Sequence, residues 1–547
     1  MMRHNLRVSG LVVVLAALVV TMSGRADEPA EQQTAKKPPV HVTISEETTR
    51  ITGPLREDGY VDYVAALNEL ASKGVTPENN AAVLFWQAVG PGEIDQQQRD
   101  RYFAMLGMSP LPEKGDYFVS LEDYVKNSET VDGVEPSYER LEEVRDQLDD
   151  AMRRPWSKRE FPMLADWLDA NQKPLELLVE ASRRPRRYDP LIAPGESLDG
   201  MVMTCFLPAL QLHREVARAL TARAMLAAGE GRIDNAWSDL LACHRFAWLS
   251  SQGATLIDAL VGVAINRTAC QGDEGVLQYV RLTADQAIAM RKDLQNLGPM
   301  PKMVDKVNVG ERYVFLDTVG VFARERVERL NTLDSPNSKI EAVVKTLVKW
   351  GSWVAIDWDV ALRMGNSWYD RMVDACHKPI RAEKRKALAT IDDDLHRLAE
   401  RARNLRSLPL AVLGNPRTAI SRQIGMILVT MLLPAVDAAT DAEDRATMRS
   451  EVTRLGFALA AYRTDHESYP ARLSDLVPKY VAEVPHDVFN AEPLHYEPRR
   501  NGYVLYSVGI NGEDDKGRSY DDRDENGEYH DWDDITIRVT SKEPKAD

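Results

Sequence analysis

The sequence lacks the short motifs that usually mark a catalytic site. It contains no glycine-rich phosphate loop, no G-x-S-x-G nucleophile elbow and no H-E-x-x-H pair of metal ligands. It also has no cysteine and histidine at a recognisable ligand spacing. The sequence therefore carries no enzyme signature.

Cysteine is scarce, with four residues among 547 and no C-x-x-C pair. This excludes a zinc ribbon and a thioredoxin-like redox motif. Each cysteine lies in an apolar, helix-like context, which fits a buried free thiol and a disulfide between neighbouring helices equally well. Four cysteines allow three pairings, and the sequence does not choose among them. The residues are Cys205, Cys243, Cys270 and Cys376.

A surplus of basic residues is also missing. The chain has 68 Lys and Arg against 84 Asp and Glu, which gives a formal charge of −16. Nucleic-acid binding needs a basic surface, and docking on anionic lipid needs one as well. The composition therefore disfavours both kinds of partner.

No apolar run reaches the roughly 20 residues that a membrane-spanning helix needs. The longest, Leu11 to Met22, follows Arg3 and Arg7 and precedes the small-residue site Gly24-Arg25-Ala26. This order predicts a cleaved signal peptide over residues 1–26, the alternative being an uncleaved N-terminal anchor. We therefore expect an exported protein, periplasmic or in the cell envelope, with no stable transmembrane span after cleavage.

Helical periodicity fills most of the rest of the chain. Residues 27–50 are rich in Glu, Gln, Lys, Pro and Thr and predict a flexible linker. A helical region over 51–200 and a helical domain over 201–415 follow. The predicted fold class is mostly α, either a helical bundle or an irregular helical array.

The C-terminal part, residues 416–547, has a different pattern. One long helix is expected from Ala435 to Tyr462, and short strands are expected at 494–496, 503–506 and 535–539. The apolar run Ile424 to Leu433 is too short to cross a bilayer. The pattern predicts an α+β domain with a long helix on a small antiparallel sheet.

Several motifs in this tail resemble the globular domain of type II secretion major pseudopilins. They are Leu455-Gly456-x-Ala458-Leu459-x-x-Tyr462-Arg463, Tyr469-Pro470-x-x-Leu473, Val484-Pro485-x-Asp487, Gly502-Tyr503-x-Leu505-Tyr506 and Asp534-Ile535. The resemblance implies a loop between the last strands that binds calcium. A pseudopilin begins with its assembly helix, whereas the corresponding helix here is internal, so filament assembly is not implied. The segment from Gly53 to Asn68 resembles large exported bacterial proteins, which implies no activity.

Acidic residues concentrate in that loop. Residues 512–534 hold eleven acids and three bases, so the loop carries 3 − 11 = −8, half the charge of the chain. Asp522-x-Asp524-x-Asn526-Gly527 has the spacing of an EF-hand loop, with the Glu528 carbonyl and Asp533 completing the set. Asp514, Asp515 and Asp534 are additional or competing ligands. We predict a Ca²⁺ site, the alternative being a solvated acidic loop.

The histidines at 213, 244 and 377 are interpreted as half-buried helix residues. The function predicted from the sequence is therefore an exported, non-enzymatic scaffold that binds calcium and other envelope proteins. One alternative is an accessory component of a type II secretion or pilus-like apparatus. Another is a hydrolase with a site assembled across distant helices, which a substrate-sized cleft lined by Asp, Glu and His would favour.

Overall fold

The computed structural model describes residues 40–130, 133–193, 201–205, 209–325, 356–403, 415–520, 522–524 and 527–540. The predicted signal peptide lies outside these residues. The fold is mostly helical, with one three-stranded antiparallel sheet near the C-terminus, so the predicted fold class is confirmed.

Short helices form the N-terminal part, and polar caps begin several of them. Asp62, Asn80, Ser120 and Ser137 each accept a hydrogen bond from a first-turn backbone N–H. The helices are α2 (Tyr63–Ser72), α3 (Ala81–Val89), α4 (Arg99–Met105), α5 (Leu121–Glu129), α6 (Tyr138–Ala151), α7 (Pro162–Ala170) and α8 (Gln172–Ser182). A 3₁₀ turn, η2 (Val202–Thr204), follows.

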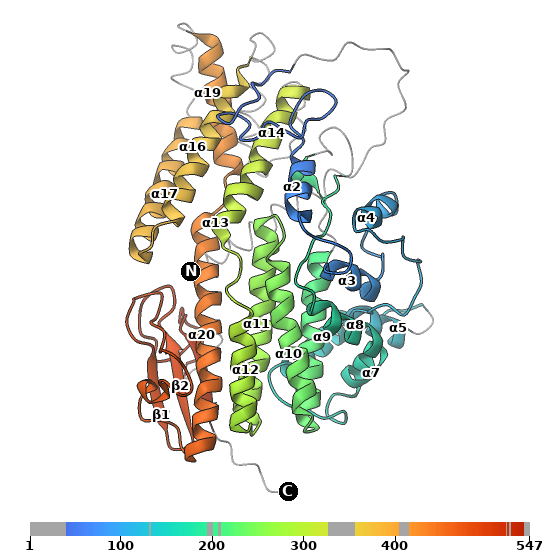
Figure 1. The fold of residues 1–547 in the computed structure, drawn as a ribbon, viewed down its shortest axis with the longest axis vertical. Helices are drawn as coiled ribbons and strands as arrows, with labels where there is room; N and C mark the ends of the chain where they lie inside the picture. Colours follow the sequence, from blue (N-terminus) through green and yellow to red (C-terminus); the bar gives the residue numbers. More distant parts are fainter. Residues whose placement is uncertain are drawn as a thin grey trace.

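Four longer helices form the centre of the molecule: α9 (Ala209–Gly229), α10 (Ile233–Ser250), α11 (Leu256–Tyr279) and α12 (Ala284–Asn296). Capping boxes at Thr255–Asp258 and Thr283–Gln286 begin α11 and α12. Helix α20 (Val436–His466) packs along both α11 and α12 (Figure 1).

A second group of helices lies beyond one end of these (Figure 1). It contains α13 (Met303–Lys306), the π-helical turn η3 (Val307–Glu311), α14 (Arg312–Glu325), α16 (Trp358–Cys376), α17 (Arg381–Arg403) and α19 (Pro416–Leu432). Ile424, Ile427, Leu428 and Val429 of α19 are buried, and α19 packs against α16 and α17. Packing inside the protein thus accounts for the apolar run that the sequence shows there.

The stretch Pro416–His466 contains an 18-residue window of mean hydropathy 1.6, and 56% of that window is buried in the structure. By length and composition it passes a test for a membrane-spanning helix, which a buried core helix also passes.

The C-terminal strands pair in the order β1 (His495–Arg499), β2 (Gly502–Ser507) and β3 (Ile535–Thr540), after the 3₁₀ turn η6 (Leu473–Leu476). Leu505 lies opposite Tyr496 on one side and Ile537 on the other. The sheet packs on α20, and β3 also contacts α11. At Gly456 of α20, an added Cβ would lie 2.7 Å from Leu277 of α11, so the helices approach closely there.

The described residues form two large hydrophobic cores and a small cluster of Leu256, Ala259, Met303 and Ala439. One core joins α3 to α12 with the second half of α20 and the sheet. The other joins residues 42–67, Leu191, Met201 and Val202 with η3, α14, α16, α17, α19 and Val436. The predicted tail domain therefore shares its core with the central helices instead of standing apart.

The last residues of the predicted flexible linker are also packed. Thr48 and Thr49 are buried, and the Asn366 side chain of α16 donates hydrogen bonds to the carbonyls of Glu47 (3.0 Å) and Thr48 (2.8 Å). The Thr43 N–H donates to Asp359 Oδ1 at 2.8 Å. The linker prediction is thus corrected for residues 40–50, because backbone groups of Thr43, Glu47 and Thr48 have partners on α16. The Thr48 and Thr49 hydroxyls donate to carbonyls nearby in the chain.

Candidate functional site

The loop between β2 and β3 brings three carboxylates together. Asp515, Asp533 and Asp534 each place one carboxylate oxygen within 4.8 Å of the others. Pairing of Ser507 with Ile535 fixes both ends of the loop, so residues far apart in sequence face one another. The structure thus gathers three of the eight ligands that the sequence predicts.

Backbone N–H groups hold these carboxylates through one oxygen each. Asp533 Oδ2 accepts from Ile510 (2.9 Å) and Asn511 (3.1 Å), and Asp534 Oδ2 accepts from Gly517 (2.7 Å). Asp515 Oδ2 accepts from the Asp533 N–H at 3.1 Å.

The second oxygens of two carboxylates have no such partner. Asp533 Oδ1 and Asp534 Oδ1 are buried and accept no hydrogen bond from the described residues. Only 1% of the Asp534 surface is exposed. A buried, unpaired carboxylate oxygen is costly, and a bound cation would remove that cost.

The pKa values of two of these carboxylates, Asp533 and Asp534, are raised. Burial raises the pKa of Asp534 to about 7, and the negative charge of Asp515 adds to the rise. Burial also raises the pKa of Asp533, again with a contribution from Asp515. Asp533 and Asp534 therefore resist ionisation without a counter-charge.

Three of the other predicted ligands have other partners in the structure. Asp522 forms an ion pair with Arg538 of β3 at 2.7 Å, and Asp524 contacts His530 at 2.9 Å. Asp514 accepts from the Tyr506 hydroxyl at 2.9 Å.

Asn526 lies outside the described residues, and Glu528 donates its N–H to Asp524. Strands, not EF-hand helices, flank the D-x-D-x-N-G segment, and β3 presents Arg538 to Asp522.

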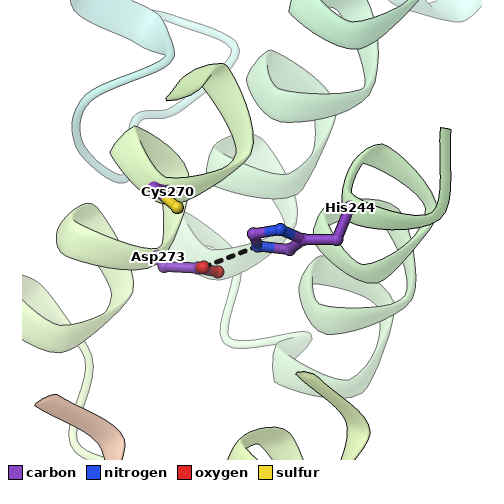
Figure 2. A group of neighbouring side chains, drawn as sticks. All are labelled: His244, Cys270 and Asp273. Atoms are coloured by element: carbon purple, nitrogen blue, oxygen red, sulfur yellow. Dashed lines mark hydrogen bonds and ion pairs between the residues drawn. The ribbon is translucent and has the colours of Figure 1, made fainter. Parts of the chain in front are cut away.

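A second group of potential ligands lies in the helical core, where the sequence analysis predicted none. His244 of α10 faces Cys270 and Asp273 of α11, and Figure 2 shows the imidazole directed at the Asp273 carboxylate. One ligand atom from each lies within 4.8 Å of the others, and all three residues are buried.

Hydrogen bonds orient this histidine. His244 Nε2 lies 2.7 Å from Asp273 Oδ2, and Nδ1 lies 3.2 Å from Asn266 Oδ1. The amide oxygen can only accept, so Nδ1 carries a proton. Asn266 in turn donates to the Ser450 hydroxyl of α20 at 3.2 Å. Both partners of the ring therefore lie on α11, and α20 holds one of them, Asn266.

In the His244, Cys270 and Asp273 group, one carboxylate oxygen lacks a hydrogen-bond partner among the described residues, and burial changes the pKa of the thiol. Asp273 Oδ1 is buried and has no hydrogen-bond partner in the described part of the chain. Burial raises the pKa of the Cys270 thiol to about 12, with a further contribution from the Asp273 charge. The thiol is thus neutral at physiological pH unless a cation binds.

A cavity of about 450 Å³ adjoins the group and is lined by His244 and Cys270. Trp248, Met300 and Met303 give its wall an apolar character. The two glutamates that line the cavity already have partners in its wall. Glu443 accepts from the Met303 N–H at 2.9 Å, and Glu451 pairs with Arg454.

The sequence held one signal that would have found this group. Asn266, Cys270 and Asp273 recur at i, i+4 and i+7 and so share one face of an otherwise apolar helix. The number of residues between His244 and this face gives no such signal, because His244 lies on a different helix, α10. His244 was interpreted as half-buried, and the structure buries it fully.

The structure also shows the surroundings of His213, His377 and the four cysteines. His213 is buried with its ring 4.5 Å from that of Phe85, and burial lowers its pKa well below the usual value. His377 is exposed. All four cysteines are described, and each is a free thiol in the structure.

Comparison of the chain with protein-family models, curated proteins and solved structures gave no match.

Proposed function

We propose that the protein is an exported interaction protein whose C-terminal region binds Ca²⁺ through Asp515, Asp533 and Asp534. The observation that carries this proposal is the pair of buried, unpartnered oxygens on Asp533 and Asp534. Hard carboxylate oxygens suit Ca²⁺, and weak sites are typical of extracellular modules, with dissociation constants of roughly 10⁻⁴–10⁻³ M. The resemblance of the tail to pseudopilin globular domains agrees with a calcium loop at this place.

The role of the ion would be structural. The loop that holds the three carboxylates also contacts the helices: Arg385 of α17 donates to the Ile510 carbonyl at 3.0 Å, and Arg267 of α11 lies 4.8 Å from the Tyr520 ring centroid. A cation that orders the loop would therefore order the surface it shares with α11 and α17. Envelope proteins are the partners that this surface would meet after export.

Calcium titration of the full chain tests the proposal. We expect binding in the wild type and a loss of at least about tenfold in affinity for Asp534→Asn. Asp531→Asn is the matched control, because it removes the same charge from an exposed position of the same loop. No heat at several millimolar Ca²⁺, or equal loss in both variants, would overturn the proposed site.

The partner class needs a separate measurement. Crosslinking in the native envelope, with and without chelator, should recover a calcium-dependent partner. Recovery of pilus-type subunits would favour the alternative role as an accessory component of a secretion apparatus. Recovery of no partner in either condition would contradict the scaffold role while leaving the calcium site intact.

The cavity beside His244 favours a second candidate, a hydrolase. Its volume suits a small molecule, and His244, Glu443 and Glu451 line it while Asp273 lies behind His244. The cavity thus offers histidine and glutamate, two of the three residue types that the sequence analysis named for such a cleft. Soaking or titration with small ester and amide substrates, followed by a His244→Ala comparison, would test it.

A further inference from the structure

The His244, Cys270 and Asp273 group has the composition of a transition-metal site. It offers one imidazole nitrogen, one thiol sulfur and one carboxylate oxygen, which are the three donor types that Zn²⁺ accepts in proteins. The mixed donor set separates it from the acidic loop, whose ligands are all oxygen and suit a harder cation. We propose that His244, Cys270 and Asp273 bind a divalent ion of the zinc class.

The position of the imidazole proton supports this assignment. Because Nδ1 donates to Asn266, Nε2 is the nitrogen that faces Asp273 and the other ligand atoms, and a bound ion would replace the proton that Nε2 and Asp273 Oδ2 share at 2.7 Å. Histidine ligands of metals usually donate their other ring N–H to a second group in this way. Asn266 is itself held by Ser450, so the orienting shell is present without the ion.

The unpaired oxygen of Asp273 is the second observation. The carboxylate is fully buried, and only Oδ2 has a hydrogen-bond partner among the described residues. An ion bound between the three side chains would satisfy the carboxylate. A divalent ion with one thiolate, one carboxylate and a neutral imidazole has no net charge, which suits a buried position.

The cavity supplies access and a fourth position. His244 and Cys270 both line it, whereas Asp273 lies behind them. Zinc sites with three protein ligands keep a fourth position for water or another small ligand. The coordination would therefore be of the open kind that the hydrolase alternative requires, although binding itself does not depend on any activity.

Cobalt provides the direct test, because a thiolate bound to Co²⁺ gives a sulfur-to-metal charge-transfer absorption that oxygen ligands do not. We expect one equivalent of Co²⁺ per chain to produce this band in the metal-stripped full-length protein, and Zn²⁺ to abolish it by displacement. Cys270→Ser should lose the band. Cys243→Ser is the matched control, since Cys243 is also a fully buried thiol of this core but contacts Thr221 and Ala217.

The readouts separate loss of the site from loss of the fold. Circular dichroism and the urea midpoint of each variant report folding, and Asn266→Ala should weaken Zn²⁺ by about 10–100-fold while Cys270 remains. Absence of the band in folded wild-type protein overturns the proposal. Persistence of the band in Cys270→Ser overturns the assignment of the thiol. Neither result bears on the calcium loop, whose test uses Asp534→Asn.

Discussion

The acidic loop and the helical core each bring three potential ligands together, but they differ in the partners that their carboxylates find. In the loop, Asp515, Asp533 and Asp534 lie among many other carboxylates. Several carboxylates of the loop are paired with Arg538, His530 or a backbone N–H group. In the core, the Asp273 carboxylate has one hydrogen-bond partner among the described residues, His244 Nε2. The density of acids in a sequence is therefore a poorer guide to a site than the number of buried oxygens left unpaired.

The comparison also shows what each site would do for the fold. The loop joins two strands at the edge of the molecule, whereas the core group lies where α10, α11 and α20 meet. An ion in the loop would order a surface, and an ion in the core would tie helices of the first hydrophobic core together.

The largest effect is expected from breaking the core pair. Asp273→Ala removes the partner of a buried histidine and should lower the free energy of unfolding by about 3–5 kcal/mol. Urea denaturation measures it. Asp531→Ala in the exposed part of the loop is the reference and should stay within about 0.5 kcal/mol of the wild type. A cost below about 1 kcal/mol for Asp273→Ala would show that solvent reaches the pair.

Calcium should stabilise the protein through the loop and not through the core. At a hundred times its dissociation constant the ion adds about 2.7 kcal/mol to the stability of whatever it binds. Asp534→Asn should abolish the rise in melting temperature that Ca²⁺ produces. Asp522→Asn should preserve most of it, since Asp522 pairs with Arg538. The reverse ranking would restore the EF-hand spacing as the true ligand set.

Substitution of a glycine beside the loop site should also disturb Asp533. Gly509 has φ +69°, and an added Cβ would lie 2.3 Å from the Asp533 carbonyl oxygen and 2.5 Å from its Oδ1. Gly509→Ala should cost about 1–2 kcal/mol and weaken Ca²⁺ binding, because Asp533 must move. Gly512→Ala is the control: its φ is also positive, but no atom lies near the added Cβ. Equal calcium affinities in the two variants would contradict a role for Asp533.

A buried acid with complete partners sharpens the comparison. Asp317 accepts from the Val202 N–H at 2.7 Å and lies 3.8 Å from Arg56. Burial raises its pKa to about 6.

The folded state then holds the proton more tightly than the unfolded state. The stability that this group contributes is therefore fully present below the unfolded pKa of about 3.9 and is lost as the pH rises from there through 6. Between pH 5 and 7 the wild type should lose about 1 kcal/mol relative to Asp317→Asn. Urea midpoints of both proteins across this range measure it, and parallel curves would contradict the raised pKa. Metal ions should leave the difference unchanged.

Local structure was predictable from the sequence. Helical apolar periodicity predicted the helices, and the short runs at 503–506 and 535–539 predicted strands, because both patterns depend on neighbours in the chain. The long helix expected at 435–462 occurs at Val436–His466. The concentration of acids between the last strands was likewise visible without a structure.

Only the tertiary structure decided which residues meet. Asp515 reaches Asp533 and Asp534 because β2 and β3 close the loop at Ser507 and Ile535, and Asp522 is diverted by Arg538 of β3. His244 reaches Asp273 because α10 and α11 pack along each other, and the same packing unites the tail with the central helices in one core. These contacts join residues that are distant in sequence, so their geometry follows from helix packing and strand register, which no local pattern encodes.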